Sequence, residues 1–120
     1  MTDAFGFRAV FSVLLPGTNA VVEPDMAALR PLGVTNQSCR FSFPGLPDSV
    51  KGPLELMRPA LDMVLACEPD RIVVAYSPEY MNDGVNGASE LRRIFEERIE
   101  IPFTLASDAV SEALKALEVT

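Results

Sequence analysis

VVAYSPEYMNDGVNG, residues 73–87, decides the fold, because an apolar run stops there and gives way to a polar, glycine-containing loop. The run from Ile72 to Tyr76 indicates a buried strand, and Ser77-Pro78 ends it. Apolar residues then return at helical spacing between Ala88 and Arg98. Strand, polar loop and helix in this order are typical of an open α/β sheet, in which ligands bind at the carboxyl ends of the strands. An ordinary strand-to-helix connection has the same pattern.

The same alternation of strand and helix runs through the whole chain. Strands are expected at Phe7–Leu15, Val34–Phe43, Arg71–Tyr76 and Ile101–Leu105. Helices are expected at Glu23–Leu29, at Leu54–Ala66, at Ala88–Arg98 and from Ser107 to Leu117. The order predicts a doubly wound, flavodoxin-like α/β fold: a four-stranded parallel sheet with helices on both faces, forming a single domain over residues 1–120.

Three local features refine this expectation. A loop is predicted from Pro44 to Pro53, and Pro59 is expected to kink or divide the helix that follows. Ser107 is the predicted N-cap of the last helix. The residues predicted to form the buried stripe of that helix are Val110, Ala113, Leu114 and Leu117.

Composition excludes several classes of function. The 120 residues carry 10 Lys and Arg against 17 Asp and Glu, a net charge of −7 that repels nucleic acid and anionic membrane surfaces. The longest apolar run, near Ala9–Pro16, is too short to span a bilayer, and it lacks the flanks of a signal peptide. With no His and two Cys, neither a metal site nor a cofactor is expected. A cytoplasmic protein is the prediction.

The loops after parallel strands converge at one sheet edge, so their side chains predict a site there. Hydroxyl, amide and helix N-terminal groups at this edge suit a small anion. The residues predicted to contact it are Gly17, Thr18, Asn19, Ser77, Pro78, Glu79, Tyr80 and Ser107. Each also has a purely structural reading: Thr18 and Asn19 can cap a turn, and Glu79 can be a solvated loop carboxylate. Cys39 and Cys67 are expected to be buried, unreactive thiols.

Two segments resemble the maleate isomerase and arylmalonate decarboxylase group of the aspartate/glutamate racemase superfamily. The first is Val13–Asn19 followed by Val22–Asp25, and the second is Glu97–Thr104 followed by Ser107–Val110 and Ala113–Leu117. Proteins of that group are roughly twice as long and have two similar lobes that face each other across a cleft. The resemblance implies that this chain corresponds to the N-terminal lobe.

The resemblance also implies roles for particular residues. Asn19 matches the asparagine that holds a substrate carboxylate, and Ser77 or Pro78 falls where the family has its first-lobe cysteine. The missing thiol argues against a two-thiol racemase and is compatible with an enzyme in which the other lobe supplies the cysteine. Ser77 is therefore the one catalytic candidate in this chain, and the isolated chain is expected to be weakly active or inactive.

Three hypotheses follow. The first is a cofactor-independent isomerase, racemase or decarboxylase of small dicarboxylates that needs a second lobe or a second copy of the chain. The second is a non-catalytic small-acid-binding or interaction module that kept the fold without the thiol. The third is a flavodoxin-like domain of unrelated function. Under the first, an apolar face is left exposed, and self-association is expected.

Overall fold

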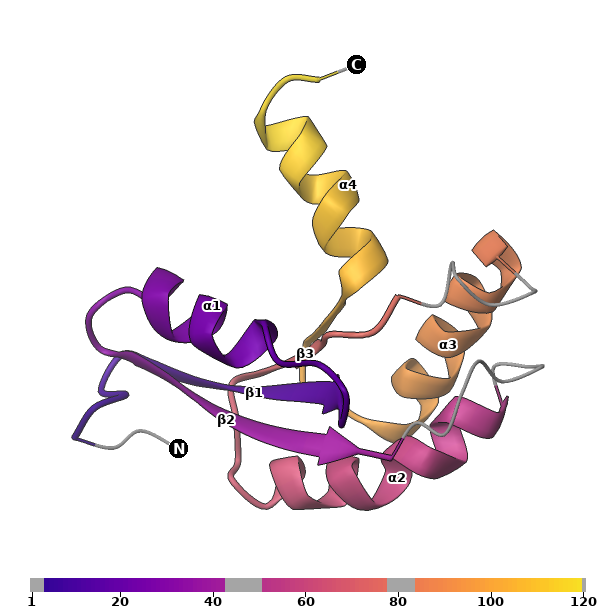
Figure 1. Ribbon diagram of the computed structural model, residues 1–120, viewed down its shortest axis with the longest axis horizontal. Coiled ribbons are helices and arrows are strands. Elements are labelled where there is room, and N and C mark those ends of the chain that lie inside the picture. The colour runs from indigo at the N-terminus through magenta and orange to yellow at the C-terminus, as the bar shows by residue number, and fades with distance from the viewer. Residues whose placement is uncertain (1–3, 43–50, 78–83, 120) are drawn as a thin grey trace.

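The computed structural model describes residues 4–42, 51–77 and 84–119, which form an α/β fold (Figure 1). The strands of this part of the chain are β1 (Ala9–Pro16), β2 (Val34–Phe41), β3 (Arg71–Val74) and β4 (Phe103–Leu105). Its helices are α1 (Val22–Leu29), α2 (Lys51–Leu65), α3 (Gly84–Arg98) and α4 (Ala106–Ala116). Strand and helix alternate from end to end, as predicted.

The four described strands form one parallel sheet in the order β2-β1-β3-β4. β1 is the central strand, because it pairs with β2 on one side and with β3 on the other. Leu14 lies beside Val74, and Val74 lies beside Leu105, so these side chains point to the same face. The predicted four-stranded parallel sheet is confirmed.

α2 and α3 cover this face and enclose the main hydrophobic core, while α1 lies against the opposite face (Figure 1). The buried Ser12 also points toward α2, where its hydroxyl donates to the carbonyl of Val64 at 3.4 Å. Helices therefore lie on both faces, which confirms the doubly wound arrangement. The core residues are Leu14, Phe41, Met57, Ala60, Leu61, Val64, Ile72, Val74, Tyr76, Leu91, Ile94, Phe95, Ile99 and Leu105.

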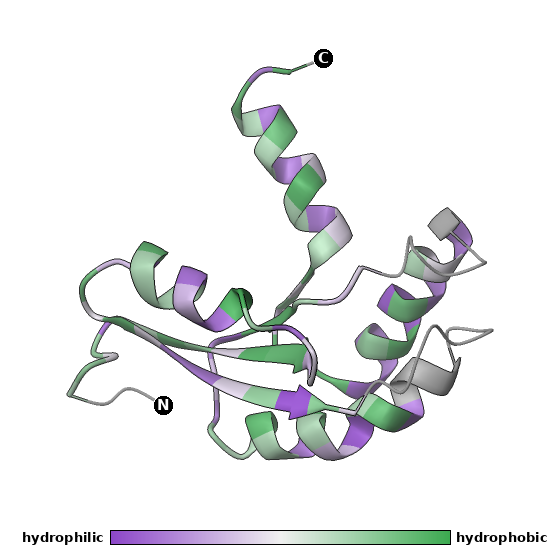
Figure 2. Cartoon of the chain, viewed as in Figure 1, coloured by the Kyte–Doolittle hydropathy of each residue, from purple (hydrophilic) through white to green (hydrophobic). Residues whose placement is uncertain are grey.

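α4 departs from the prediction. It leaves β4 and projects away from the rest of the molecule, and no residue within it is buried (Figures 1 and 2). The predicted buried stripe is therefore wrong for this chain by itself: Val110 is 62% exposed, Leu114 45% and Leu117 72%. The physical reason is the joint, since β4 ends at Leu105 and α4 begins at Ala106 without a connecting loop. A helix needs a loop of about 2–6 residues to turn back over its own sheet.

Several boundaries also differ from expectation. α2 already begins at Lys51, inside the predicted loop, and it continues through Pro59 as one helix. β4 is limited to Phe103–Leu105, and α3 starts at Gly84 rather than near Ala88. Helix and strand ends are the part of a fold that local sequence determines least.

Gly33 sets the turn between α1 and β2. Its φ of 82° lies in the left-handed region, and its carbonyl accepts hydrogen bonds from the backbone N–H groups of Arg8 at 2.8 Å and Ala9 at 3.3 Å. A Cβ built on Gly33 would lie 2.7 Å from the Phe7 ring. Phe7 is exposed and its ring can move, so the backbone conformation is the main constraint.

We expect Gly33→Ala to lower the free energy of unfolding by roughly 1–2 kcal/mol, because a side chain in the left-handed region is strained. The matched control is Gly17→Ala. The φ of Gly17 lies outside that region, and its added Cβ would meet the Phe41 carbonyl oxygen at 3.4 Å. The control should change the free energy by less than about 1 kcal/mol. Urea unfolding of both variants measures the difference in the free energy of unfolding. Equal decreases in the two variants would show that the left-handed backbone at Gly33 is not the main constraint.

Candidate functional site

The candidate site lies where the chain changes direction across the sheet. From β1 the connection through α1 leads to β2 on one side, and from β2 the connection through α2 leads to β3 on the other side. The switch point is therefore the carboxyl edge between β1 and β3. In open α/β sheets ligands bind in the crevice at such a point. The β1–α1 loop and the residues after β3 flank it.

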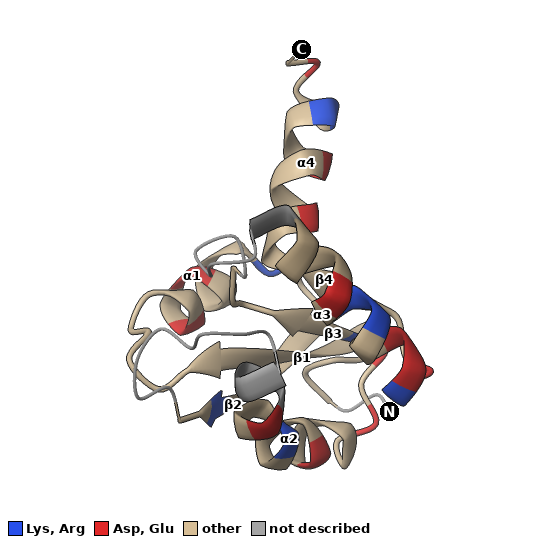
Figure 3. Cartoon of the chain, turned by 90° about the vertical axis from the view of Figure 1, so that its right-hand side faces the viewer, with Lys and Arg blue, Asp and Glu red and all other residues tan. Residues whose placement is uncertain are grey.

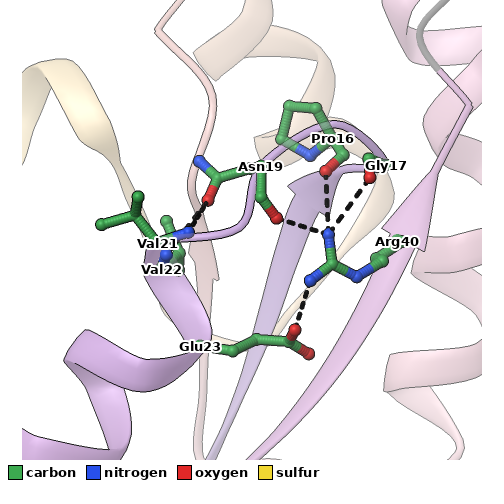
Figure 4. Close-up of polar contacts among 7 residues, drawn as sticks. All are labelled: Pro16, Gly17, Asn19, Val21, Val22, Glu23 and Arg40. Atoms are coloured by element: carbon green, nitrogen blue, oxygen red, sulfur yellow. Dashed lines mark hydrogen bonds and ion pairs between the residues drawn. The ribbon is translucent and has the colours of Figure 1, made fainter.

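Asn19 organises the loop after β1 (Figure 4). Its side-chain Oδ1 accepts hydrogen bonds from the backbone N–H groups of Val21 at 2.9 Å and Val22 at 3.0 Å. Its own N–H donates to the carbonyl of Pro16 at 3.0 Å. The amide oxygen therefore satisfies donors at the start of α1, as an N-terminal cap does.

Capping also determines what Asn19 offers to a ligand. Because Oδ1 is bound to two N–H donors, the other end of the carboxamide is its Nδ2 amino group, which can only donate. Within the described chain no residue accepts a hydrogen bond from Nδ2. The structure shows the turn cap, which uses the oxygen, and the cap leaves the NH2 group as the remaining polar end of the side chain.

Arg40, at the end of β2, holds the same loop in place and was not predicted from the sequence (Figure 4). Its Nη1 donates to the carbonyls of Gly17 at 3.3 Å and Pro16 at 3.5 Å, and also to that of Asn19. Its Nη2 forms an ion pair with Glu23 in the first turn of α1. Arg40 thereby compensates an acidic charge that would otherwise repel an anion at this helix end.

The other predicted site residues fall into three groups. Gly17 and Thr18 are exposed in the turn after β1, and Ser77 is half-buried three residues after the end of β3. Ser107 lies inside the first turn of α4. Pro78, Glu79 and Tyr80 lie outside the described residues.

The predicted cap role of Ser107 is wrong, because Leu105 occupies the N-cap position of α4. The direct β4–α4 joint moves the helix start ahead of the serine. The Asp108 carboxylate accepts from the Leu105 N–H at 3.3 Å and forms an ion pair with Arg92. The Ser107 hydroxyl oxygen is buried and has no hydrogen-bond partner among the described residues, so it retains its donor and acceptor capacity.

Neither cysteine contributes a thiol to this edge. Cys39 lies within β2, where its sulfur is 3.9 Å from that of Met63 in α2. Cys67 follows α2, and its sulfur lies 4.0 Å from the Met63 carbonyl oxygen. Both are free and half-buried. The loop after β1 and the described residues after β3 therefore offer hydroxyl and amide groups.

Two aromatic rings lie in the core near the ends of β2 and β3, the two strands that flank β1. Phe41, the last residue of β2, and Tyr76, just after β3, make an edge-to-face contact with centroids 6.1 Å apart. Burial raises the pKa of the Tyr76 phenol above its usual value, because removal from water disfavours the phenolate. This buried pair of rings therefore carries no charge at physiological pH.

Metal ligation and membrane insertion find no support in the described part of the chain. It contains no cluster of three His, Cys, Asp or Glu side chains placed to hold a metal ion. None of its helices has both the length and the hydropathy needed to cross a membrane.

Comparison with known proteins does not assign the chain to a family: no protein-family model and no curated protein matches it. The relation to the maleate isomerase and arylmalonate decarboxylase group stays a prediction that depends on the two segments of sequence that resemble that group.

We expect Arg40→Met to loosen the β1–α1 loop without unfolding the protein. The ion pair with Glu23 is 38% and 42% exposed, so its loss should cost less than about 1 kcal/mol of global stability. The backbone amides of Gly17 and Asn19, which donate to Phe41 and Pro16 carbonyls, should exchange with solvent several-fold faster.

Hydrogen exchange followed by NMR makes this measurement. Arg58→Met on α2 is the control, because Arg58 reaches Glu55 only at 4.0 Å. Equal exchange rates at Gly17 and Asn19 in the two variants would show that Arg40 does not hold the loop.

We expect the free energy of unfolding to fall as the pH rises above 10, partly through Tyr76. In the unfolded chain the tyrosine ionises near its ordinary pKa of 10.0, whereas the folded phenol keeps its proton to higher pH. The unfolded state then binds fewer protons, so alkaline pH favours it. Urea unfolding on either side of pH 10 should show a smaller pH dependence in Tyr76→Phe than in the unsubstituted chain. An unchanged pH dependence would contradict this.

Proposed function

We propose that this chain is the first lobe of a cofactor-independent, cytoplasmic isomerase, racemase or decarboxylase of small dicarboxylates. The substrate would bind at the crevice between β1 and β3, with one carboxylate against the β1–α1 loop. The observation that carries the proposal is the orientation of Asn19, whose oxygen is bound to the backbone and whose NH2 is left to donate. An uncharged donor at a helix N-terminus suits a carboxylate.

Other groups at the edge support the same chemistry. Arg40 pairs with Glu23, which reduces the repulsion of this carboxylate toward an anion. The hydroxyls of Thr18, Ser77 and Ser107 come from three loops or helix starts at the same edge, and that of Ser107 lacks a partner among the described residues. Donors of this kind stabilise the enediolate that forms when a proton or carbon dioxide leaves a carboxylated carbon.

Proton transfer itself requires a group of suitable pKa. The Ser77 hydroxyl is too weak an acid to serve as a base without a helper. In this proposal Ser77 therefore contacts the substrate, and a thiol from a second lobe or second copy moves the proton. The two free cysteines of this chain, which lie elsewhere, are compatible with a reducing compartment.

A second candidate function is a non-catalytic module that binds small acids. It is favoured by one observation: Ser77 or Pro78, neither of which has a thiol, falls at the position where the resemblance predicts a cysteine. The two candidate functions share the carboxylate site. They differ only in whether the bound acid is converted to a product.

We expect Asn19→Asp to weaken dicarboxylate binding while the fold is kept. An aspartate retains the oxygen that accepts from Val21 and Val22, and it is at least as good a cap. It replaces the donating NH2 by a second carboxylate oxygen, which repels an acid ligand. Affinity for maleate or malonate, measured by calorimetry and by thermal shift, should fall at least ~10-fold.

Asn36→Asp is the matched control, because it adds the same charge on β2 beside Arg30, whose Nη1 donates to Asn36 at 2.9 Å. This control should bind as the unsubstituted chain does. If the unsubstituted chain binds neither maleate nor malonate, or if Asn19→Asp binds as tightly as Asn36→Asp, the proposed site is wrong. Binding with no conversion, even after a cysteine-containing second lobe is supplied, would favour the module over the enzyme.

A further inference from the structure

Two surfaces with apolar side chains are left partly or fully exposed in the described part of the chain. The first is the open face, defined here as the α1-side surface of β3 and β4 together with Phe11 of β1. Its residues are Phe11, Arg71, Val73, Ala75 and Thr104. The second is the α4 stripe, defined as Val110, Leu114 and Leu117.

The open face is apolar sheet surface that no described helix covers. Val13, Val73 and Thr104 share one register and point to the side that carries α1. Val13 is fully buried, whereas Val73 and Thr104 are half-exposed, because α1 lies over the β1–β2 half of the sheet. A groove of about 430 Å³ lies on this side of the sheet, lined by Met26 of α1 and by residues of β1 and β3.

The α4 stripe is equally unpartnered. Its residues recur at spacings of four and three, so they lie on one side of the helix. Figure 2 shows apolar bands that alternate with polar ones along α4. An amphipathic helix that extends into solvent gains no burial from this side, and helices of this length owe most of their stability to such packing.

α4 does not cover the open face of its own chain. The direct Leu105–Ala106 joint leaves no loop for a reversal. Arg92 also holds the first turn of α4 through its ion pair with Asp108, and the same guanidinium stacks over Phe103 at 5.6 Å. Elements joined too tightly to pack within one chain are those that exchange between chains.

Size and charge both match an exchange. The eleven residues of α4 span ~16 Å, which is the length of about five extended residues, as in the segment Arg71–Ala75. A helix ~10 Å wide covers two strands that are ~4.8 Å apart. Arg71 on the open face donates to Thr104 at 3.0 Å and has no carboxylate partner among the described residues. In the segment from Ala106 to Val119, Asp108 is paired with Arg92 and Glu112 with Lys115. Glu118, just after α4, is the carboxylate of this segment that has no ion pair among the described residues (Figure 3).

We propose that two copies of this chain form a two-fold dimer by exchanging α4, so that the α4 stripe of each copy packs on the open face of the other. Each copy then contributes one helix and one face, which makes the contact self-complementary and closed. The inference does not depend on the proposed acid site, because none of the residues that form the two surfaces belongs to the Asn19 loop.

Cross-linking between two singly substituted chains tests the contact directly. In a Cys39→Ser, Cys67→Ser background, one chain carries Val73→Cys and the other, bearing a tag, carries Leu114→Cys. Mild oxidation of the mixture should give a mixed disulfide at a yield several-fold above that of Val73→Cys with Glu112→Cys. Glu112 is the matched control, because it pairs with Lys115 on the polar side of α4.

Sedimentation equilibrium of the unsubstituted chain and of Leu114→Glu gives a second readout. The unsubstituted chain should be a dimer, and Leu114→Glu should raise the dimer dissociation constant at least tenfold. Its unfolding as a monomer should be unchanged, because Leu114 contributes nothing to the core of its own chain.

Three results would overturn the proposal. One is a monomer at all concentrations, and another is a dimer that Leu114→Glu does not weaken. The third is equal cross-linking through positions 112 and 114. Loss of acid binding would leave these readouts unaffected, so the two proposals fail independently.

Discussion

The parallel pairing of β1 on both of its sides is the constraint on which the rest of the structure depends. Because β1 accepts β2 at one edge and β3 at the other, the chain must leave it in one direction and return in the other. That reversal places α1 on one face and α2 and α3 on the opposite face, and it puts the topological switch point at the carboxyl edge between β1 and β3. The main core and the candidate site are thus two consequences of one strand arrangement.

Most of the fold could be predicted from the sequence, because the signals are local. Short apolar runs and helical spacing are properties of neighbouring residues, and they identified every described strand and helix. The position of α4, which projects away from the sheet, could not be predicted in the same way. The pattern of Val110, Leu114 and Leu117 indicates that one side of the helix favours burial. It does not indicate against which surface that side packs. The absence of a loop at Leu105–Ala106 decides that, and a boundary of this kind is where prediction is weakest.

The candidate site likewise contains one residue that local sequence identifies and one that it does not. Asn19 could be identified because it follows a predicted strand, and the structure shows its capping role through the two hydrogen bonds that Oδ1 accepts. Arg40 could not be identified, since it contacts the loop from another strand, 21 residues away from Asn19. Its only signal in the sequence is a charged residue near the end of a strand, and solvated arginines are common at such positions. Long-range polar contacts of this kind need the fold before they can be recognised.

The first turn of α4 belongs both to the candidate site at the carboxyl edge and to the helix that we propose is exchanged between copies. Ser107 and Asp108 occupy its first turn, where Asp108 is tied to Arg92 and where the Ser107 hydroxyl has no partner among the described residues. A change in this turn alters both the direction in which α4 leaves the sheet and the groups presented at the carboxyl edge. A change at Leu114, two turns further along, alters the helix surface alone. A loss of acid binding therefore reports on the crevice only when the variant keeps Arg92 and Asp108 paired. For the same reason Leu114, and no residue of the first turn, separates the role of the helix from the role of the site.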